Sequence, residues 1–124
     1  MSEGYDRGLE VRREVLGADY VDAAIDGASP FTRAMQDHVT EHCWGSVWTR
    51  PGLDRRTRSL LNIAMLTALN RSHELAGHVR GALNNGCTEE EIQETLLQAA
   101  VYCGMPAGME SFRVADRVLQ EVRS

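Results

Sequence analysis

Hydrophobic residues recur every three or four positions along most of the chain, with polar residues between them. This period is that of amphipathic α-helices, each of which buries one face. No segment alternates hydrophobic and polar residues for long enough to predict a β-strand. The pattern therefore predicts an all-α fold, a compact bundle of about six or seven helices.

Glycine and asparagine residues divide the hydrophobic pattern into separate segments. Gly17, Asn70 and Gly104 each follow a helical run and predict where it ends. We expect helices over residues 4–16, 18–25, 30–44, 54–69, 72–84, 88–103 and 106–122. Residues 45–52 form the one substantial irregular segment between them.

Several of these helices have recognisable end signals. Ser29 precedes a proline, which is typical of an N-cap followed by the first helical residue. Thr88 has a glutamate three residues later, which predicts a capping box. We expect Asp54 and Ser72 to cap the helices that follow them, and Gly86 to adopt the left-handed conformation after a helix.

The centre of the expected helix 54–69 is apolar nearly all round. Residues 60–66 read Leu-Leu-Asn-Ile-Ala-Met-Leu, and Asn62 interrupts the apolar stretch. A helix of this kind lies at the centre of a core or in a subunit interface.

Composition narrows the class of protein. A chain of 124 residues is about one domain, so we expect a single domain over residues 1–124. The net charge of −5 argues against nucleic-acid binding. No apolar stretch is long enough for a membrane span or a signal peptide, and we expect a cytoplasmic protein. Cys43, Cys87 and Cys103 form no Cys-x-x-Cys motif, and we expect them to be reduced and mostly buried.

Glu74 and His78 form the best candidate for chemistry. They are four residues apart on an expected helix and therefore share a face. A carboxylate beside an imidazole favours the imidazolium, which makes a proton-transfer pair near neutral pH. The alternative is an ordinary ion pair on a solvated helix face.

Other candidates have weaker support. Arg80 follows the pair on the same expected helix and can orient a carboxylate, although helix arginines are usually only solvated. His42 ends a helix, where histidine often serves the helix dipole or packs against tryptophan. Trp44 begins a segment that can line a pocket, although a hydrophobic anchor is the more common role. His73 and His78 are five residues apart, which does not fit a zinc-binding helix, so we expect no metal.

Three segments together resemble the carboxymuconolactone decarboxylase family. They are Glu41–Leu53, with Trp-Thr-Arg-Pro-Gly-Leu at its end and Thr57-Arg58-Ser59-Leu60 following it, residues 70–86 with Glu74, His78 and Arg80, and Tyr102–Ala107. The likeness runs from about Tyr5 to Val122. The related alkylhydroperoxidase D-like proteins carry Cys-x-x-Cys-x-x-x-His on the second segment. Here Arg71 and Glu74 occupy the cysteine positions, so dithiol peroxide chemistry is not expected.

The resemblance implies an alkylhydroperoxidase D-like fold, a homo-oligomer (a trimer or a hexamer) and no cofactor. It also implies decarboxylation of 4-carboxymuconolactone to β-ketoadipate enol-lactone in the protocatechuate branch of the β-ketoadipate pathway. The substrate would be a small dicarboxylate lactone.

Site roles follow from this implied reaction. His78 is the expected general acid, with Glu74 orienting it, and His42 is an expected oxyanion donor or second proton carrier. Arginines suit the substrate carboxylates, and we expect Arg50 and Arg80 to bind them, with Arg58 a weaker candidate. Trp44 and Met65 would form an apolar wall beside the departing carboxylate.

Two other classes of function stay open at this point. One is a related cofactor-free lyase or isomerase acting on another acid, because a fold does not determine its chemistry. The other is a non-catalytic oligomeric binding protein, in which Glu74 and His78 would be a plain surface pair.

Overall fold

The computed structural model describes residues 2–124, which form seven α-helices and one π-helical segment and contain no strand. The elements are α1 (Glu3–Leu16), α2 (Ala18–Asp26), α3 (Pro30–His38), η1 (Val39–Trp44), α4 (Arg55–Ala68), α5 (Ser72–Asn84), α6 (Glu89–Cys103) and α7 (Met105–Arg123). The predicted all-α fold is confirmed, and most predicted helix bounds lie close to those observed. None of the described helices is long and apolar enough to cross a membrane.

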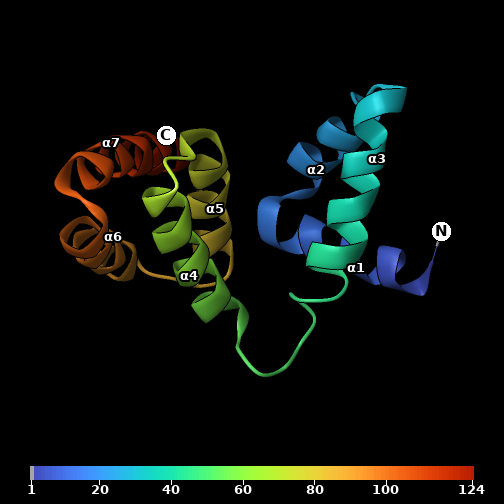
Figure 1. Cartoon of the computed structure of the whole chain (residues 1–124), viewed down its shortest axis with the longest axis horizontal. Helices are drawn as coiled ribbons and strands as arrows, with labels where there is room; N and C mark the ends of the chain where they lie inside the picture. The colour runs from blue at the N-terminus through green and yellow to red at the C-terminus, as the bar shows by residue number, and fades with distance from the viewer. Residues whose placement is uncertain (1) are drawn as a thin grey trace. The chain divides into compact units, whose positions relative to one another are not determined.

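Contacts within the chain group its elements into two compact units, Met1–Asp54 and Arg55–Ser124 (Figure 1). The first unit holds α1 to η1, and the second holds α4 to α7. Each unit has its own hydrophobic cluster. The single domain over residues 1–124 stays a prediction.

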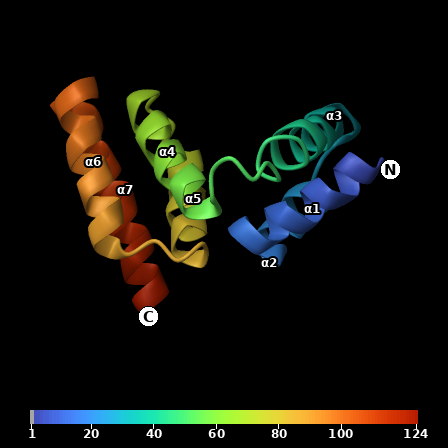
Figure 2. The same ribbon diagram turned by 90° about the horizontal axis from the view of Figure 1, so that it is seen from below.

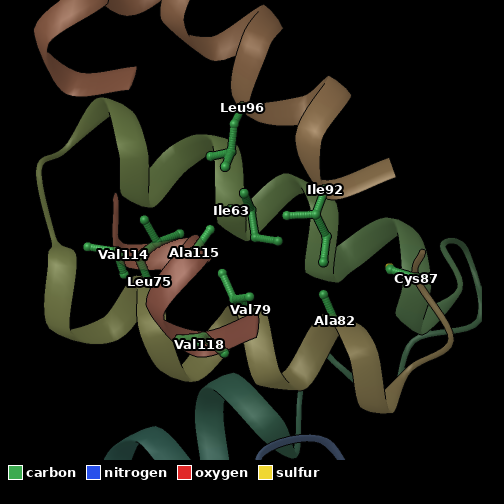
Figure 3. Packing of buried hydrophobic residues seen from close by; sticks show 10 residues of the cluster. All are labelled: Ile63, Leu75, Val79, Ala82, Cys87, Ile92, Leu96, Val114, Ala115 and Val118. Atoms are coloured by element: carbon green, nitrogen blue, oxygen red, sulfur yellow. The ribbon is translucent and has the colours of Figure 1, made fainter. Parts of the chain in front are cut away.

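The second unit is a four-helix bundle, in which α4 packs against α5 and α6, and α7 packs against α5 and α6 (Figure 2). Ile63 of α4 is fully buried and lies among side chains from the other three helices (Figure 3). Burial of such side chains contributes about 1.5–3 kcal/mol each. The core is completed by Leu75, Val79, Ala82, Cys87, Ile92, Leu96, Val114, Ala115 and Val118.

The apolar stretch of α4 is only partly used by this core. Ile63 is buried with two polar neighbours one turn away, Ser59 and Thr67. Leu61 is 45% exposed and Met65 is 51% exposed. Of the two predicted positions for this helix, the centre of a core is confirmed for the one stripe of α4 that faces the other three helices, and a subunit interface stays a prediction.

In the first unit, α1 packs so closely against η1 that glycine is required at the contact. A Cβ atom at Gly8 would lie 2.0 Å from the carbonyl oxygen of Thr40 and 2.8 Å from the backbone nitrogen of Gly45. A Cβ atom at Gly45 would lie 2.2 Å from the carbonyl oxygen of Gly4. Gly8 on α1 and Gly45 after η1 therefore allow two backbones to touch.

The prediction of a single α-helix over residues 30–44 has to be corrected. Its first part is α-helical, but Val39–Trp44 forms π-helical turns. Gly45 donates its N–H to the carbonyl of Thr40 at 2.9 Å, and Trp48 donates to Cys43 at 3.1 Å, each across five residues. The apolar spacing could not show this, because it does not distinguish a π-helical turn from an α-helical one; η1 is the segment that packs against α1.

The helix-end signals agree with the structure at most positions. Ser29 and Thr88 are N-caps, each with a complete capping box. Gly86 has φ +89°, the left-handed conformation that was predicted. Ser72 is wrong as a cap: it is the first residue of α5, and Arg71 occupies the N-cap position without a side-chain cap bond.

The three cysteines are free thiols in the described residues. Cys87 is buried, Cys43 is half-buried and Cys103 is exposed. The expectation of mostly buried cysteines therefore fails at Cys103, which ends α6 beyond the core stripe of that helix.

We predict that Gly8→Ala destabilises the first unit by about 1–3 kcal/mol, because the added methyl group meets backbone atoms that cannot move aside. Both tryptophans, Trp44 and Trp48, lie in this unit, so the fluorescence-monitored urea unfolding curve reports on it. Gly77→Ala is the control: a Cβ atom there meets nothing within 4 Å, and the change should not lower stability. An unchanged midpoint for Gly8→Ala would contradict the packing described.

Candidate active site

His78 lies on α5 at the border of the bundle core. Leu75, Val79 and Ala82 are buried and fix the side of α5 that faces the core. His78 precedes Val79 and is half-buried. The core contacts of its neighbours therefore hold the imidazole against α4 instead of in open solvent.

Asn62 of α4 meets the imidazole there. Its Nδ2 atom lies 3.4 Å from Nδ1 of His78, a long hydrogen bond between two half-buried groups. Asn62 is not among the residues predicted for the site from the sequence. The sequence signal for Asn62 was a single amide side chain within an apolar helical stretch. The sequence shows it as a break in the apolar pattern and does not show which residue it contacts.

Burial lowers the pKa of His78 below the ordinary value of 6.5, and the charge of Glu74 raises it by less. The expectation that Glu74 would favour the imidazolium is correct for that one interaction but wrong for the net shift. Desolvation penalises the charged ring more than the carboxylate stabilises it. The free protein therefore holds His78 mainly as a neutral imidazole near pH 7.

Glu74 lies in the first turn of α5 and is exposed. It is one turn before His78 on the same face, as predicted. An exposed carboxylate is screened by water, which explains why its effect on the imidazole is the smaller one.

The arginines of the second unit point in different directions. Arg80 pairs with Glu121 of α7, and two residues along a helix place it on nearly the opposite side of α5 from His78. Arg58 is half-buried on α4, one turn before Asn62 and on the same face. Arg58, the weaker candidate, therefore shares the α4 face of Asn62, the residue that contacts His78, whereas Arg80 lies away from His78.

The other three predicted site residues belong to the first unit, which is described by itself. His42 is exposed within η1, with its ring 4.8 Å from that of His38. Trp44 is only 3% exposed and stacks on Trp48 with ring centroids 4.6 Å apart, which favours the hydrophobic-anchor role. Arg50 is exposed in the segment that follows. Their roles toward a substrate stay predictions.

The site in the second unit can hold and move a proton. An imidazole with a lowered pKa can bind or release a proton near neutral pH, and a carboxylate and an arginine lie on the same two helix faces. Acid–base work on a small anionic molecule is the chemistry that this combination favours.

Comparison with known proteins identifies the group to which this site belongs. Residues 33–117 match the model of the carboxymuconolactone decarboxylase family. The chain is 48% identical over 118 residues to a nitrosuccinic acid decarboxylase of Metarhizium robertsii, covering 95% of the chain and 82% of the relative. It is 42% identical over 118 residues to a 4-carboxymuconolactone decarboxylase of Acinetobacter baylyi, covering 95% of the chain and 88% of the relative.

The chain therefore belongs to the carboxymuconolactone decarboxylase family, and the resemblance inferred from its sequence motifs is confirmed. The similarity to two decarboxylases with different named substrates leaves the substrate to be argued from chemistry.

We predict that His78 titrates below pH 6.5 in the folded protein, and that Glu74→Gln lowers its pKa further because the stabilising charge is removed. The chemical shifts of the imidazole protons, followed by NMR against pH, measure both values. Glu94→Gln, which removes an exposed charge on α6, should leave the pKa of His78 unchanged. An upward shift in Glu74→Gln would contradict the electrostatics described.

Proposed function

We propose that this member of the carboxymuconolactone decarboxylase family removes CO₂ from 4-carboxymuconolactone and releases β-ketoadipate enol-lactone in the protocatechuate branch of the β-ketoadipate pathway. The observation that carries the proposal is the half-buried His78 with its lowered pKa, on one helix face with Glu74. The 42% identity to a 4-carboxymuconolactone decarboxylase supports the choice of substrate.

The substrate itself supplies the electron sink for this reaction. When the carbon–carbon bond to the carboxylate breaks, its electron pair moves through the ring double bond onto the lactone carbonyl oxygen. The resulting furanolate is stabilised by aromaticity, and the proposed reaction needs no cofactor. The protein has to orient the two carboxylates, stabilise the oxyanion and deliver one proton to the α carbon.

His78 delivers that proton in our proposal. The neutral imidazole of the free protein gains a proton when the substrate brings two carboxylates close to it, because nearby negative charge raises the pKa of histidine. Nε2 or Nδ1 then gives up its proton as the new C–H bond forms. Since the protonated ring is the reactive form, kcat/KM falls as the pH rises through the lowered pKa of free His78.

Arg58 is the arginine that the geometry favours for binding a substrate carboxylate, since it shares the α4 face with Asn62. Arg80 has an acidic partner on α7, and binding of a substrate would compete with that ion pair. Arg50 and His42 remain proposed contacts to the carboxylate and the oxyanion, respectively. Met65 is 51% exposed on α4 and is the proposed apolar neighbour of the departing CO₂.

Nitrosuccinic acid is a second candidate substrate, favoured by the 48% identity to a nitrosuccinic acid decarboxylase. It shares the chemical logic of the first. Loss of CO₂ from the carbon that bears the nitro group leaves a nitronate, whose charge lies on the nitro oxygens, and protonation at carbon gives 3-nitropropanoate. Both candidates are dicarboxylic acids. In each, the departing carboxylate lies on a carbon bonded to a group that can accept the electron pair, the unsaturated lactone or the nitro group.

We also propose that the chain forms a homo-oligomer, a trimer or a hexamer, in the cytoplasm. Leu61 and Met65 on α4, and Val101 and Tyr102 on α6, are large apolar side chains left exposed within their own unit. Exposed apolar surface of this extent is typical of an association surface. Light scattering on the purified protein measures the assembly directly.

The proposed reaction is tested by proton NMR in D₂O with the two dicarboxylic acids compared side by side. We expect 4-carboxymuconolactone, made in situ by a cycloisomerase, to yield enol-lactone with one deuterium at the α carbon, faster than the spontaneous reaction. His78→Gln should reduce turnover by about 10²–10⁴-fold, the usual contribution of a general acid. Exposed His73→Gln is the matched control and should retain activity.

Fast turnover of nitrosuccinic acid without turnover of the lactone would transfer the assignment to the second substrate. A folded protein that accelerates neither reaction would overturn the proposed function. Near wild-type turnover in His78→Gln would remove His78 as the proton donor.

A paired comparison separates the two candidate arginines of the second unit, Arg58 and Arg80. We predict that Arg58→Met raises KM by about ten-fold or more, because a charge-assisted hydrogen bond to a carboxylate contributes roughly 1.5–3 kcal/mol. Arg80→Met breaks an exposed ion pair with Glu121 and should change KM less. Steady-state kinetics of the two variants decide, and a larger KM effect in Arg80→Met would reverse the assignment.

A further inference from the structure

Asn62 is a polar residue placed where the fold has no structural need for one. It lies within the apolar stretch of α4 and is half-buried, and its amide lies 3.4 Å from the Nδ1 atom of His78. A half-buried amide that meets a histidine in this way contributes to the state of that histidine.

The chemistry of the contact specifies where the ring carries its proton. The Nδ2 group of asparagine is a hydrogen-bond donor only, so the Nδ1 atom facing it has to accept. A neutral imidazole carries one proton, which then lies on Nε2.

We infer that Asn62 is a positioning residue that holds His78 with its transferable proton on Nε2, so that this nitrogen and not Nδ1 faces the reacting carbon. The inference deepens the proposed function and rests on it for the role of His78. It assigns Asn62 no contact with the substrate.

An amide suits both protonation states of the ring. In the neutral state its N–H donates to Nδ1. When the ring gains a proton at Nδ1, a half-turn of the amide lets its oxygen accept from the new N–H. Release of the Nε2 proton to carbon then breaks one N–H bond and forms one C–H bond, while Nδ1 keeps its proton and its hydrogen bond to the amide oxygen.

Neither a carboxylate nor an aliphatic side chain can replace this behaviour. The carboxylate introduced by Asn62→Asp would accept only, which favours a proton on Nδ1 and the charged ring. Asn62→Leu keeps the branched shape of the side chain but offers no hydrogen bond. The charged group that shifts the pKa of the ring is Glu74 on its own helix, Arg58 lies one turn before Asn62 on α4, and neither is altered in these variants.

The test uses the full-length protein labelled with ¹⁵N at its histidine rings, without any ligand. Long-range ¹H–¹⁵N correlation distinguishes the two neutral tautomers, and His78→Gln identifies the signals of His78. We expect the Nε2–H form in the unaltered protein, a mixture of tautomers in Asn62→Leu, and an upward shift of the titration in Asn62→Asp. Gln93→Leu, which removes an exposed amide on α6, is the matched control and should leave the spectrum of His78 unchanged.

Turnover provides the second readout. We expect Asn62→Leu to lower kcat by about ten- to one-hundred-fold with little change in KM, a smaller loss than that of His78 itself. An Nδ1–H tautomer in the unaltered protein would overturn the inference. An Nε2–H population in Asn62→Leu equal to that of the unaltered protein would overturn it too. These spectra do not depend on any substrate, so failure of the proposed reaction would be seen separately, as a folded protein that accelerates neither decarboxylation.

Discussion

The packing of α4 against α5 is the interaction on which the site depends. Ile63 is 0% exposed among the side chains of α5, α6 and α7, and it fixes both the rotation and the height of α4. Asn62 is its neighbour in the chain, and His78 is the neighbour of buried Val79 on α5. Buried Ile63 and Val79 thus place Asn62 and His78, their neighbours in the chain. Tight packing leaves little freedom for either helix to turn.

This packing also determines the charge of the imidazole. On an isolated helix the carboxylate of Glu74 would be the main influence on His78 and would favour the imidazolium. Against α4 the ring loses water, and the cost of desolvation exceeds the attraction of an exposed carboxylate, so the pKa falls. In the proposed reaction, a ring that is neutral when free and charged beside a dianionic substrate would link substrate binding to proton uptake, which suits an acid that acts after CO₂ has left.

The two candidate substrates explain how one site can serve relatives with different names. A lactone carbonyl and a nitro group are both electron sinks carried by the substrate, so the protein has to supply only orientation, charge complementarity and a proton. The residues that differ between such relatives are then expected around the substrate and not at the proton donor. Within this chain, α4 to α7 form a hydrophobic core of their own.

The sequence by itself determined the helices and the candidate proton-transfer pair. Periodicity, the caps at Ser29 and Thr88 and the glycine after α5 are local signals, and a spacing of four residues is enough to place Glu74 and His78 on one face. Tertiary structure decided what no local signal contains: the π-helical turns of η1 beside Gly8, the partner of Arg80 on α7, and the pairing of Asn62 with His78. Each of these depends on residues distant in the chain, and the direction of a pKa shift depends on burial, which exists only once the helices have packed.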